Sequence, residues 1–194
     1  MISLDIENLF TNVPVTETIN IILNKLFPDD YVCYHGFNRD EFRTLLSLAV
    51  EHSYFTFNNN LFKQKDGMAM GSPLGPIFAN IFLAHNESSW LANSPVTPFL
   101  YKRYVDDTLL LVPTDSDVNQ LLAHMNSQHP NIRFTLETET NDSLNFLGLT
   151  TNRKHDLANN VYSFETKVYR KPTHSPLLTN FNSFTPLFYR LTVA

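Results

Sequence analysis

Three carboxylates could share one task in this sequence, although they lie far apart along the chain. Asp106 and Asp107 are adjacent, whereas Asp5 stands near the amino end. Carboxylate oxygens are the ligands that Mg²⁺ prefers. Two ions bridged by such acids stabilise both the attacking and the leaving oxygen of an in-line phosphoryl displacement. The acids therefore predict metal-assisted phosphoryl chemistry, provided that the fold brings Asp5 to the pair.

The neighbourhood of the Asp-Asp pair decides how it is interpreted. An isolated pair most often marks an ordinary solvated turn, since Asp is at home in tight turns. Here β-prone residues 99–104 precede the pair and β-prone residues 108–112 follow it. We therefore expect both acids at the tip of a β-hairpin.

The first half of the chain predicts a strand, two helices and a hairpin. Residues 2–6 are apolar and β-prone, and the break at 12–14 precedes a helix with its apolar face at Ile19, Ile22, Leu23 and Leu26. A second helix is expected after Asn38, where Glu41 completes a capping box. Residues 54–57 and 61–64 flank three asparagines, a pattern typical of a hairpin.

The second half completes a recognisable order of elements. The Gly- and Pro-rich residues 67–76 lead into a helix whose apolar face is Ile77, Phe78, Ile81, Phe82 and Leu83. After the acidic hairpin we expect a helix capped near Ser116, then strands at 134–137, 146–150 and 161–169. The order β-α-β-β-α-β is the split-βαβ arrangement, an antiparallel sheet on two helices with the first strand beside the central hairpin. Asp5 would then approach Asp106 and Asp107.

Composition sets limits on these expectations. The chain has 194 residues, 43% of them hydrophobic and 17% charged, which indicates one globular domain. It shows no stretch that could span a bilayer and no secretory signal, so we expect an intracellular, nuclear location. Cys33 is the single cysteine and cannot form an internal disulfide. The net charge of −5 and the pI near 5.7 argue against a grip on nucleic acid by bulk positive charge, although a separate basic strip could still face phosphates.

Several segments together resemble the reverse transcriptase family. Residues 104–107 (Tyr-Val-Asp-Asp) resemble its YxDD signature, residues 3–14 its first palm motif and residues 71–80 its second. Residues 145–149 resemble the Phe-Leu-Gly element that follows the catalytic hairpin. Residues 168–173 resemble the next segment in Penelope-like retroelements. The resemblance implies an α+β polymerase palm, with a split-βαβ (ferredoxin-like) antiparallel sheet packed on helices and the fingers largely missing.

The resemblance also implies an activity, RNA-directed DNA synthesis with an RNA or DNA template, a DNA primer and deoxynucleoside triphosphates. The metal ligands would be Asp5, Asp106 and Asp107, with the backbone carbonyl of Ile6 as a further ligand, for two Mg²⁺ ions or Mn²⁺. Phe10 would be the sugar gate that excludes a 2′-hydroxyl. From the residues alone, Phe10 is equally well explained as a core side chain.

Nucleotide and primer contacts follow from the same resemblance. Gly71, Ser72 and Pro73 would form a platform for the base pair, although a plain helix entry explains them too. Gln64 would be a nucleotide contact, displaced from the position that Gly67 occupies here. The primer would be held by Tyr104, Lys167, Arg170 and Lys171, although a solvated strand edge is an equal explanation for the lysines.

Three other interpretations stay open. One is an RNA-dependent RNA polymerase, although such an enzyme usually has a smaller or polar residue at the position of Phe10. Another is a metal-dependent nuclease, in which the Gly-Ser-Pro turn would have no clear function. The third is an inactive retroelement remnant that at most binds nucleic acid, since the sequence starts close to Asp5. We expect residues 1–173 to form the palm and residues 174–194 a tail or the start of a truncated thumb.

Overall fold

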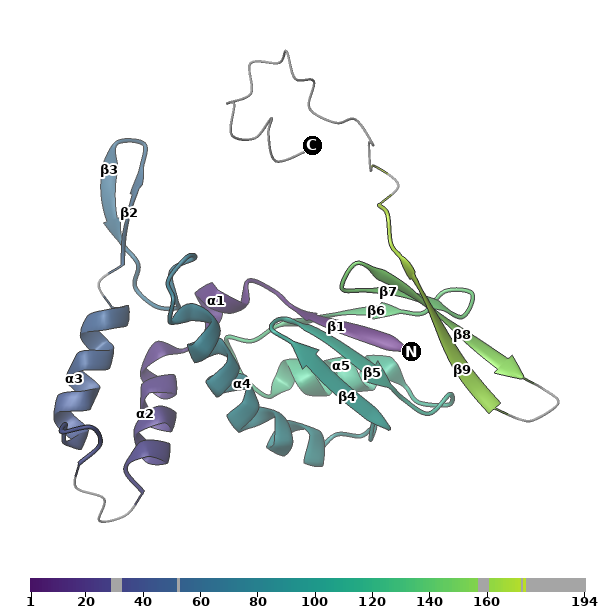
Figure 1. Ribbon diagram of the computed structural model, residues 1–194, viewed down its shortest axis with the longest axis horizontal. Helices are drawn as coiled ribbons and strands as arrows, with labels where there is room; N and C mark the ends of the chain where they lie inside the picture. Colours follow the sequence, from purple (N-terminus) through teal and green to yellow (C-terminus); the bar gives the residue numbers. More distant parts are fainter. Residues whose placement is uncertain (29–32, 52, 157–160, 172, 174–194) are drawn as a thin grey trace.

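A four-stranded antiparallel sheet lies at the centre of the fold (Figure 1). The computed structural model describes residues 1–28, 33–51, 53–156, 161–171 and 173. The strand order is β4-β5-β1-β6, formed by β1 (Ile2–Ile6), β4 (Leu100–Tyr104), β5 (Asp107–Leu111) and β6 (Phe134–Thr138). This order confirms the predicted split-βαβ arrangement, because β1 lies beside the β4–β5 hairpin.

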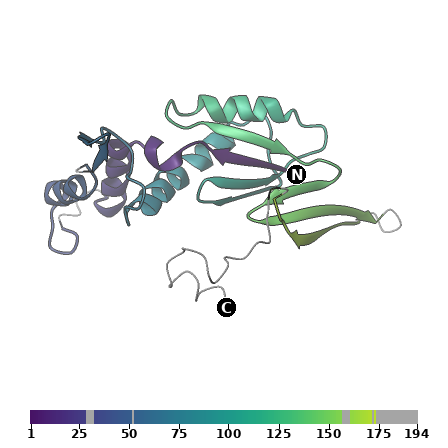
Figure 2. The same cartoon turned by 90° about the horizontal axis from the view of Figure 1, so that it is seen from above.

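One face of the sheet is buried in the core and the other carries polar side chains, because side chains alternate along its strands. In β1, Ile2, Leu4 and Ile6 are buried while Asp5 is exposed. The buried set joins a core with residues of two helices, α4 (Gly75–Ala92) and α5 (Val118–Ser127). Figure 2 shows α5 on one side of the molecule and the last strands on the other. None of the described helices is long and apolar enough to cross a membrane.

Helix boundaries and faces differ from the predictions in detail. Ile77 is 52% exposed, because the buried row of α4 runs instead through Phe78 and Phe82. The cap of α5 is Asp117, whose carboxylate accepts from the two backbone N–H groups at 119 and 120, so the prediction near Ser116 was off by one residue. A short helix, α1 (Leu9–Asn12), was missed altogether.

A separate group of elements stands between β1 and α4 in the sequence and projects to one side of the sheet (Figure 1). It comprises α2 (Val15–Leu26), α3 (Arg39–Val50), β2 (Tyr54–Phe57) and β3 (Asn60–Lys63). The predicted capping box of Asn38 and Glu41 is confirmed at the start of α3. Arg39 then ties α3 to α2 by donating to the Leu23 and Phe27 carbonyls near the end of α2.

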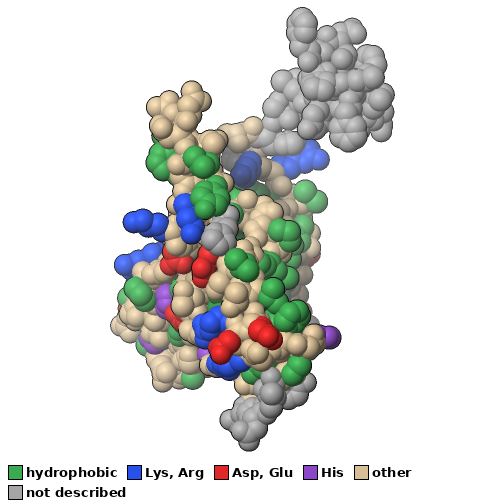
Figure 3. Space-filling model, turned by 90° about the vertical axis from the view of Figure 1, so that its left-hand side faces the viewer, with side chains coloured by type: hydrophobic (Ala, Val, Ile, Leu, Met, Phe, Trp, Pro, Cys, Tyr) green, Lys and Arg blue, Asp and Glu red, His purple; other side chains and the backbone are tan. Residues whose placement is uncertain are grey.

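The predicted β2–β3 hairpin is confirmed, but no other described element covers it. Asn58 and Asn59 adopt positive φ, as tight turns require, while Asn60 already belongs to β3. All eight strand residues are exposed. Hydrophobic side chains gather on this projection in Figure 3.

The chain after β6 forms a second antiparallel sheet of three strands. These are β7 (Ser143–Phe146), β8 (Leu149–Asp156) and β9 (Val161–Val168). The predicted single strand at 146–150 was wrong, because Leu147 and Gly148 take positive φ and reverse the chain there. Residues 174–194 lie outside the described part, so the predicted division at residue 173 stays a prediction.

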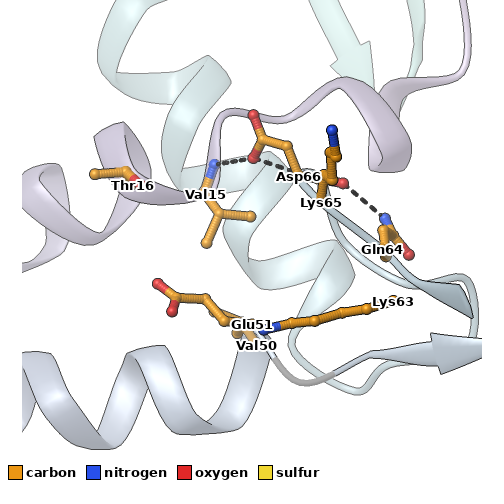
Figure 4. A pocket seen from close by; sticks show the side chains of 9 residues that line it. Val15, Thr16, Val50, Glu51, Lys63, Gln64, Lys65 and Asp66 are labelled. Carbon is orange, nitrogen blue, oxygen red and sulfur yellow. Dashed lines mark hydrogen bonds between the residues drawn. The ribbon is translucent and has the colours of Figure 1, made fainter.

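A tight contact fastens the loop before α4 to the segment after β1. Asp66 accepts a hydrogen bond from the Val15 backbone N–H at the start of α2 (Figure 4). The Met68 N–H donates to the Phe10 carbonyl. Gly67 lies between these bonds at φ +77°, against the Thr11 backbone. A side chain there would overlap the Thr11 carbonyl oxygen, so only glycine fits.

We expect Gly67→Ala to lower the free energy of unfolding by roughly 2 kcal/mol or more, from overpacking and backbone strain together. Gly36→Ala is the matched control, because Gly36 has φ +87° but no atom within 4 Å of an added Cβ. Urea denaturation of both variants measures the difference. Equal losses would contradict the steric contact with Thr11.

Candidate active site

The strand register places two of the three acids directly opposite one another. Asp5 of β1 is the partner of Asp107 of β5, so both side chains belong to the same face of the sheet. Tyr104 of β4 extends this row on one side and Thr135 of β6 on the other. The four residues cross the sheet in one line on the face opposite the core, and this line explains how Asp5 reaches the pair.

Asp106 belongs to the turn between β4 and β5, as predicted. Its backbone carbonyl accepts a hydrogen bond from the Ile6 N–H at 3.2 Å, which joins the turn to the end of β1. Val105, the other turn residue, has φ +57°, a conformation that β-branched residues rarely adopt. The turn therefore adopts a backbone shape that its surroundings must impose.

Neighbouring charges and burial perturb two of the three carboxylates, Asp5 and Asp107. Loss of water contact, and then the charges of Asp106 and Glu7, raise the pKa of Asp5, against a lowering effect of the Ile6 N–H. Loss of water contact, followed by the charges of Asp106 and Asp5, also raises the pKa of Asp107. The site therefore concentrates negative charge that the described protein groups leave incompletely compensated.

The donor atoms suit a divalent cation, because carboxylate oxygens are hard ligands. A shared positive ion would also reduce the repulsion between the neighbouring carboxylates. Among the described residues, however, no three His, Cys, Asp or Glu side chains are gathered closely enough to hold one ion. The backbone brings the acids together, and side-chain rotation would have to complete the ligand set. Metal binding by Asp5, Asp106, Asp107 and the Ile6 carbonyl therefore stays a prediction.

A cavity of about 370 Å³ connects two acids with residues from the first and second motifs. Asp5, Asp106, Phe10 and Gly71 all line it. Phe10 is half-buried on α1 and packs against the core. It therefore contributes to the core and lines this cavity at the same time. Two further lining residues, Asn8 and Met70, were not predicted, although Asn8 lies within the first motif and Met70 directly precedes the second.

A second cavity of about 480 Å³ lies on the other side of the acidic row. Asp5 and Asp107 line it together with Lys171, which follows β9, and Leu147 from the β7–β8 turn. The Tyr169 N–H donates to the Gly148 carbonyl at 2.8 Å and so holds the segment after β9 beside that turn. Of the predicted primer contacts, Lys171 and Tyr104 thus lie near the acids, and Tyr104 is 63% exposed.

Other predicted residues lie elsewhere. Gln64 lines a different cavity of about 500 Å³ between α2 and the hairpin, where its side chain donates to the Asp66 carbonyl (Figure 4). Ser72 and Pro73 belong to the turn before α4 but line neither cavity beside the acids. Lys167 and Arg170 are likewise absent from both linings. The roles predicted for these residues stay predictions.

The antiparallel palm-like sheet, with an acidic turn beside its first strand, defines a fold of the polymerase palm class. The family model described as reverse transcriptase (RNA-dependent DNA polymerase) matches residues 1–151. The chain therefore belongs to the reverse transcriptase family, as the motifs predicted. No curated protein matches the chain in sequence.

Solved structures with the same fold include two telomerases. Apo telomerase from Candida tropicalis, truncated from its C-terminal domain, matches with a TM-score of 0.58 and 15% identity over 84% of this chain. Telomerase from Candida albicans, in complex with a TWJ fragment of telomeric RNA, matches with a TM-score of 0.58 and 16% identity over 78% of this chain. This chain spans 35% and 30% of those two proteins. At such low identity the likeness concerns the fold.

The raised pKa values have a consequence for stability. A folded-state pKa above the unfolded-state value means that the folded chain binds the proton more tightly. The stabilising contribution of Asp107 is therefore present at low pH and is lost as pH rises through its folded pKa. At neutral pH without metal, its charge acts against folding.

We therefore expect Asp107→Asn to raise the melting temperature at pH 7 in metal-free buffer by a few degrees, since 1 kcal/mol is worth roughly 2–4 °C in a chain of this size. The gain should vanish near about pH 3, where the wild-type carboxylate is also protonated. The control is Asp115→Asn, at an exposed carboxylate between β5 and α5. Thermal melts at both pH values test this, and a lower melting temperature at pH 7 would contradict it.

Proposed function

We propose that this chain is the palm of an RNA-directed DNA polymerase that extends a DNA primer on an RNA or DNA template. One observation carries the proposal, namely the cross-strand pairing of Asp5 with Asp107 next to the turn that holds Asp106. Membership of the reverse transcriptase family supports the same reaction. The activity would require the parts of a whole polymerase that this chain does not itself span.

The three acids would hold two Mg²⁺ ions, or Mn²⁺, with the Ile6 carbonyl as an added ligand. Such ions, when bound, favour deprotonation of a primer 3′-hydroxyl and neutralise the charge of the leaving pyrophosphate. The chain's own part is to present the carboxylates from a rigid sheet end, so that little reorganisation accompanies the reaction. No protein nucleophile is needed.

The two cavities beside the acidic row would divide the substrates between them. The cavity with Phe10 and Gly71 would take the incoming deoxynucleotide, with the Phe10 ring against the sugar where a 2′-hydroxyl would sit. The cavity with Lys171 would take the primer end, where a cation beside Asp5 and Asp107 can hold a phosphate. Tyr104, opposite Asp107, could support the primer sugar or base.

The origin of the chain is a further part of the proposal. The resemblance of residues 168–173 to Penelope-like elements supports a retroelement source and, with it, a nuclear location. The similarity to the telomerase structures concerns the fold, so it does not bear on whether the chain comes from a retroelement. An inactive remnant of such an element is the alternative, favoured by the finding that no three acidic side chains in the described part are gathered as ligands.

The direct test is Mg²⁺-dependent extension of a DNA primer on an RNA template. We expect Asp106→Asn to reduce extension by at least about a thousandfold, because one ligand oxygen and one charge are lost where the reaction develops charge. Asp115→Asn, the same change at an exposed site, should leave extension unaltered. Extension that survives in Asp106→Asn would contradict the metal-ligand role. No extension by either chain would indicate a palm whose chemistry needs the parts of the polymerase that this chain does not span.

A second test concerns the sugar gate. Phe10→Ala should narrow the preference for deoxynucleotides over ribonucleotides by about ten- to a hundredfold, since removing the ring removes the clash with the 2′-hydroxyl. The ratio of the two kcat/KM values is the measurement, because partial loss of folded enzyme cancels in it. Phe99→Ala, at an exposed phenylalanine before β4, is the control. An unchanged ratio would leave Phe10 as a core residue only.

A further inference from the structure

A buried polar network lies under the acidic turn, on the covered face of the sheet. Arg103 of β4 pairs with the buried Thr108 in the register, so its side chain points away from the face that carries Asp5 and Asp107. There it meets Glu87 of α4 in a two-pronged ion pair, with Nε bonded to Oε1 and Nη2 to Oε2. The two side chains are only 9% and 14% exposed.

The network continues on both sides of this ion pair. The Tyr101 hydroxyl donates to Glu87 Oε1 at 2.7 Å, and Arg103 Nη2 donates to Asn80 Oδ1 of α4 at 3.1 Å. Burial, and then the charge and hydrogen bond of Glu87, raise the pKa of Tyr101, so its hydroxyl stays a donor. Arg103 is thereby fixed by α4 in one orientation.

The remaining guanidinium nitrogen contacts the turn itself. Arg103 Nη1 donates to the Val105 backbone carbonyl at 3.1 Å. Val105 is the β-branched residue with φ +57°, and such a conformation persists only where contacts impose it. Since Asp106 follows immediately, the peptide that Arg103 holds also sets the direction of the Asp106 side chain.

Stability alone explains this arrangement poorly. A buried ion pair is costly to desolvate, and well-packed apolar residues of similar volume often replace one without loss. The guanidinium, in contrast, bonds the carboxylate, an amide and a backbone carbonyl through three nitrogens held in one plane, a geometry that the single nitrogen of lysine does not reproduce. The arrangement is thus more specific in geometry than stability requires.

We propose that Arg103, oriented by Glu87, is a positioning residue that holds Val105 in the left-handed conformation and so directs the Asp106 carboxylate toward the metal site. The proposal rests on the proposed function, because it takes Asp106 as a metal ligand. Arg103 itself touches neither metal nor substrate. Its effect passes through the backbone of the turn.

The test measures Mn²⁺ binding to the chain from the EPR signal of the free ion, which does not depend on polymerase activity. We expect Arg103→Lys to weaken binding about tenfold, as loss of residues that orient metal ligands commonly does. In a Val105→Gly background, Arg103→Lys should weaken Mn²⁺ binding by at most about twofold, because glycine adopts positive φ without strain. Arg153→Lys is the matched control and should not weaken binding, because Arg153 of β8 forms ion pairs with Glu139 and Asp142 and contacts none of the three acids.

The outcomes separate this inference from the proposed function. Asp106-dependent Mn²⁺ binding in the wild type, lost in Arg103→Lys and recovered with Val105→Gly, supports positioning. Equal binding by wild type and Arg103→Lys, or equal losses in both backgrounds, overturns it while leaving the proposed function standing. No Asp106-dependent binding by the wild type overturns both. If Arg103→Lys does not fold, Glu87→Gln carries the test, with weaker binding expected and unchanged binding contradicting the inference.

Discussion

Repulsion between carboxylates at one end of a small sheet is the constraint around which this structure is arranged. Asp5 and Asp107 face each other across paired strands, with Asp106 in the adjoining turn. Besides loss of water contact, the charge of Asp106 raises the pKa of both, and the charge of Asp5 also raises the pKa of Asp107. A chain free to relax would separate them. Here β1 is hydrogen-bonded on both sides, by β5 and β6, so the backbone under Asp5 cannot withdraw.

The rest of the fold holds the surroundings of these acids in place from opposite directions. Below the sheet, the α4 network grips the turn through Arg103. At the end of β1, Gly67 and Asp66 fasten the loop before α4 to the segment that carries Phe10. Both sets of contacts involve α4 or the loop before it. This helix and its loop therefore hold the Asp106 turn and the Phe10 segment, which both line the cavity beside Asp5.

The sequence predicted what depends on short-range pattern. The apolar, β-prone residues 2–6 and the β-prone flanks of the Asp-Asp pair predicted strands, and the order of elements predicted their arrangement. Asn38 with Glu41 predicted a helix cap. It failed where long-range contacts decide. Nothing local indicates that Gly67 must touch Thr11, that Arg103 reaches under the sheet to Glu87, or that the strand expected at 146–150 reverses at Gly148.

The site residues show the same difference between what local sequence predicts and what long-range contacts decide. Motif resemblance indicated Phe10 and Gly71, and both line one cavity with Asp5. Gln64 lies in another cavity, since the loop that carries it is held to Val15 through Asp66. Lys171 lies near the acids because the Tyr169–Gly148 hydrogen bond holds the segment after β9 beside the β7–β8 turn, a contact that no local sequence pattern predicts.

The acidic balance of the chain finally admits a simple physical explanation. A net charge of −5 counts against binding to nucleic acid, yet three of those acids stand together at the sheet end. Two bound divalent cations would cancel most of that net charge, and they would do so at the position where a phosphate must approach. With Lys171 at the edge of the same cavity, the local field beside the acids would then favour a polyanion, whatever the sign of the whole chain.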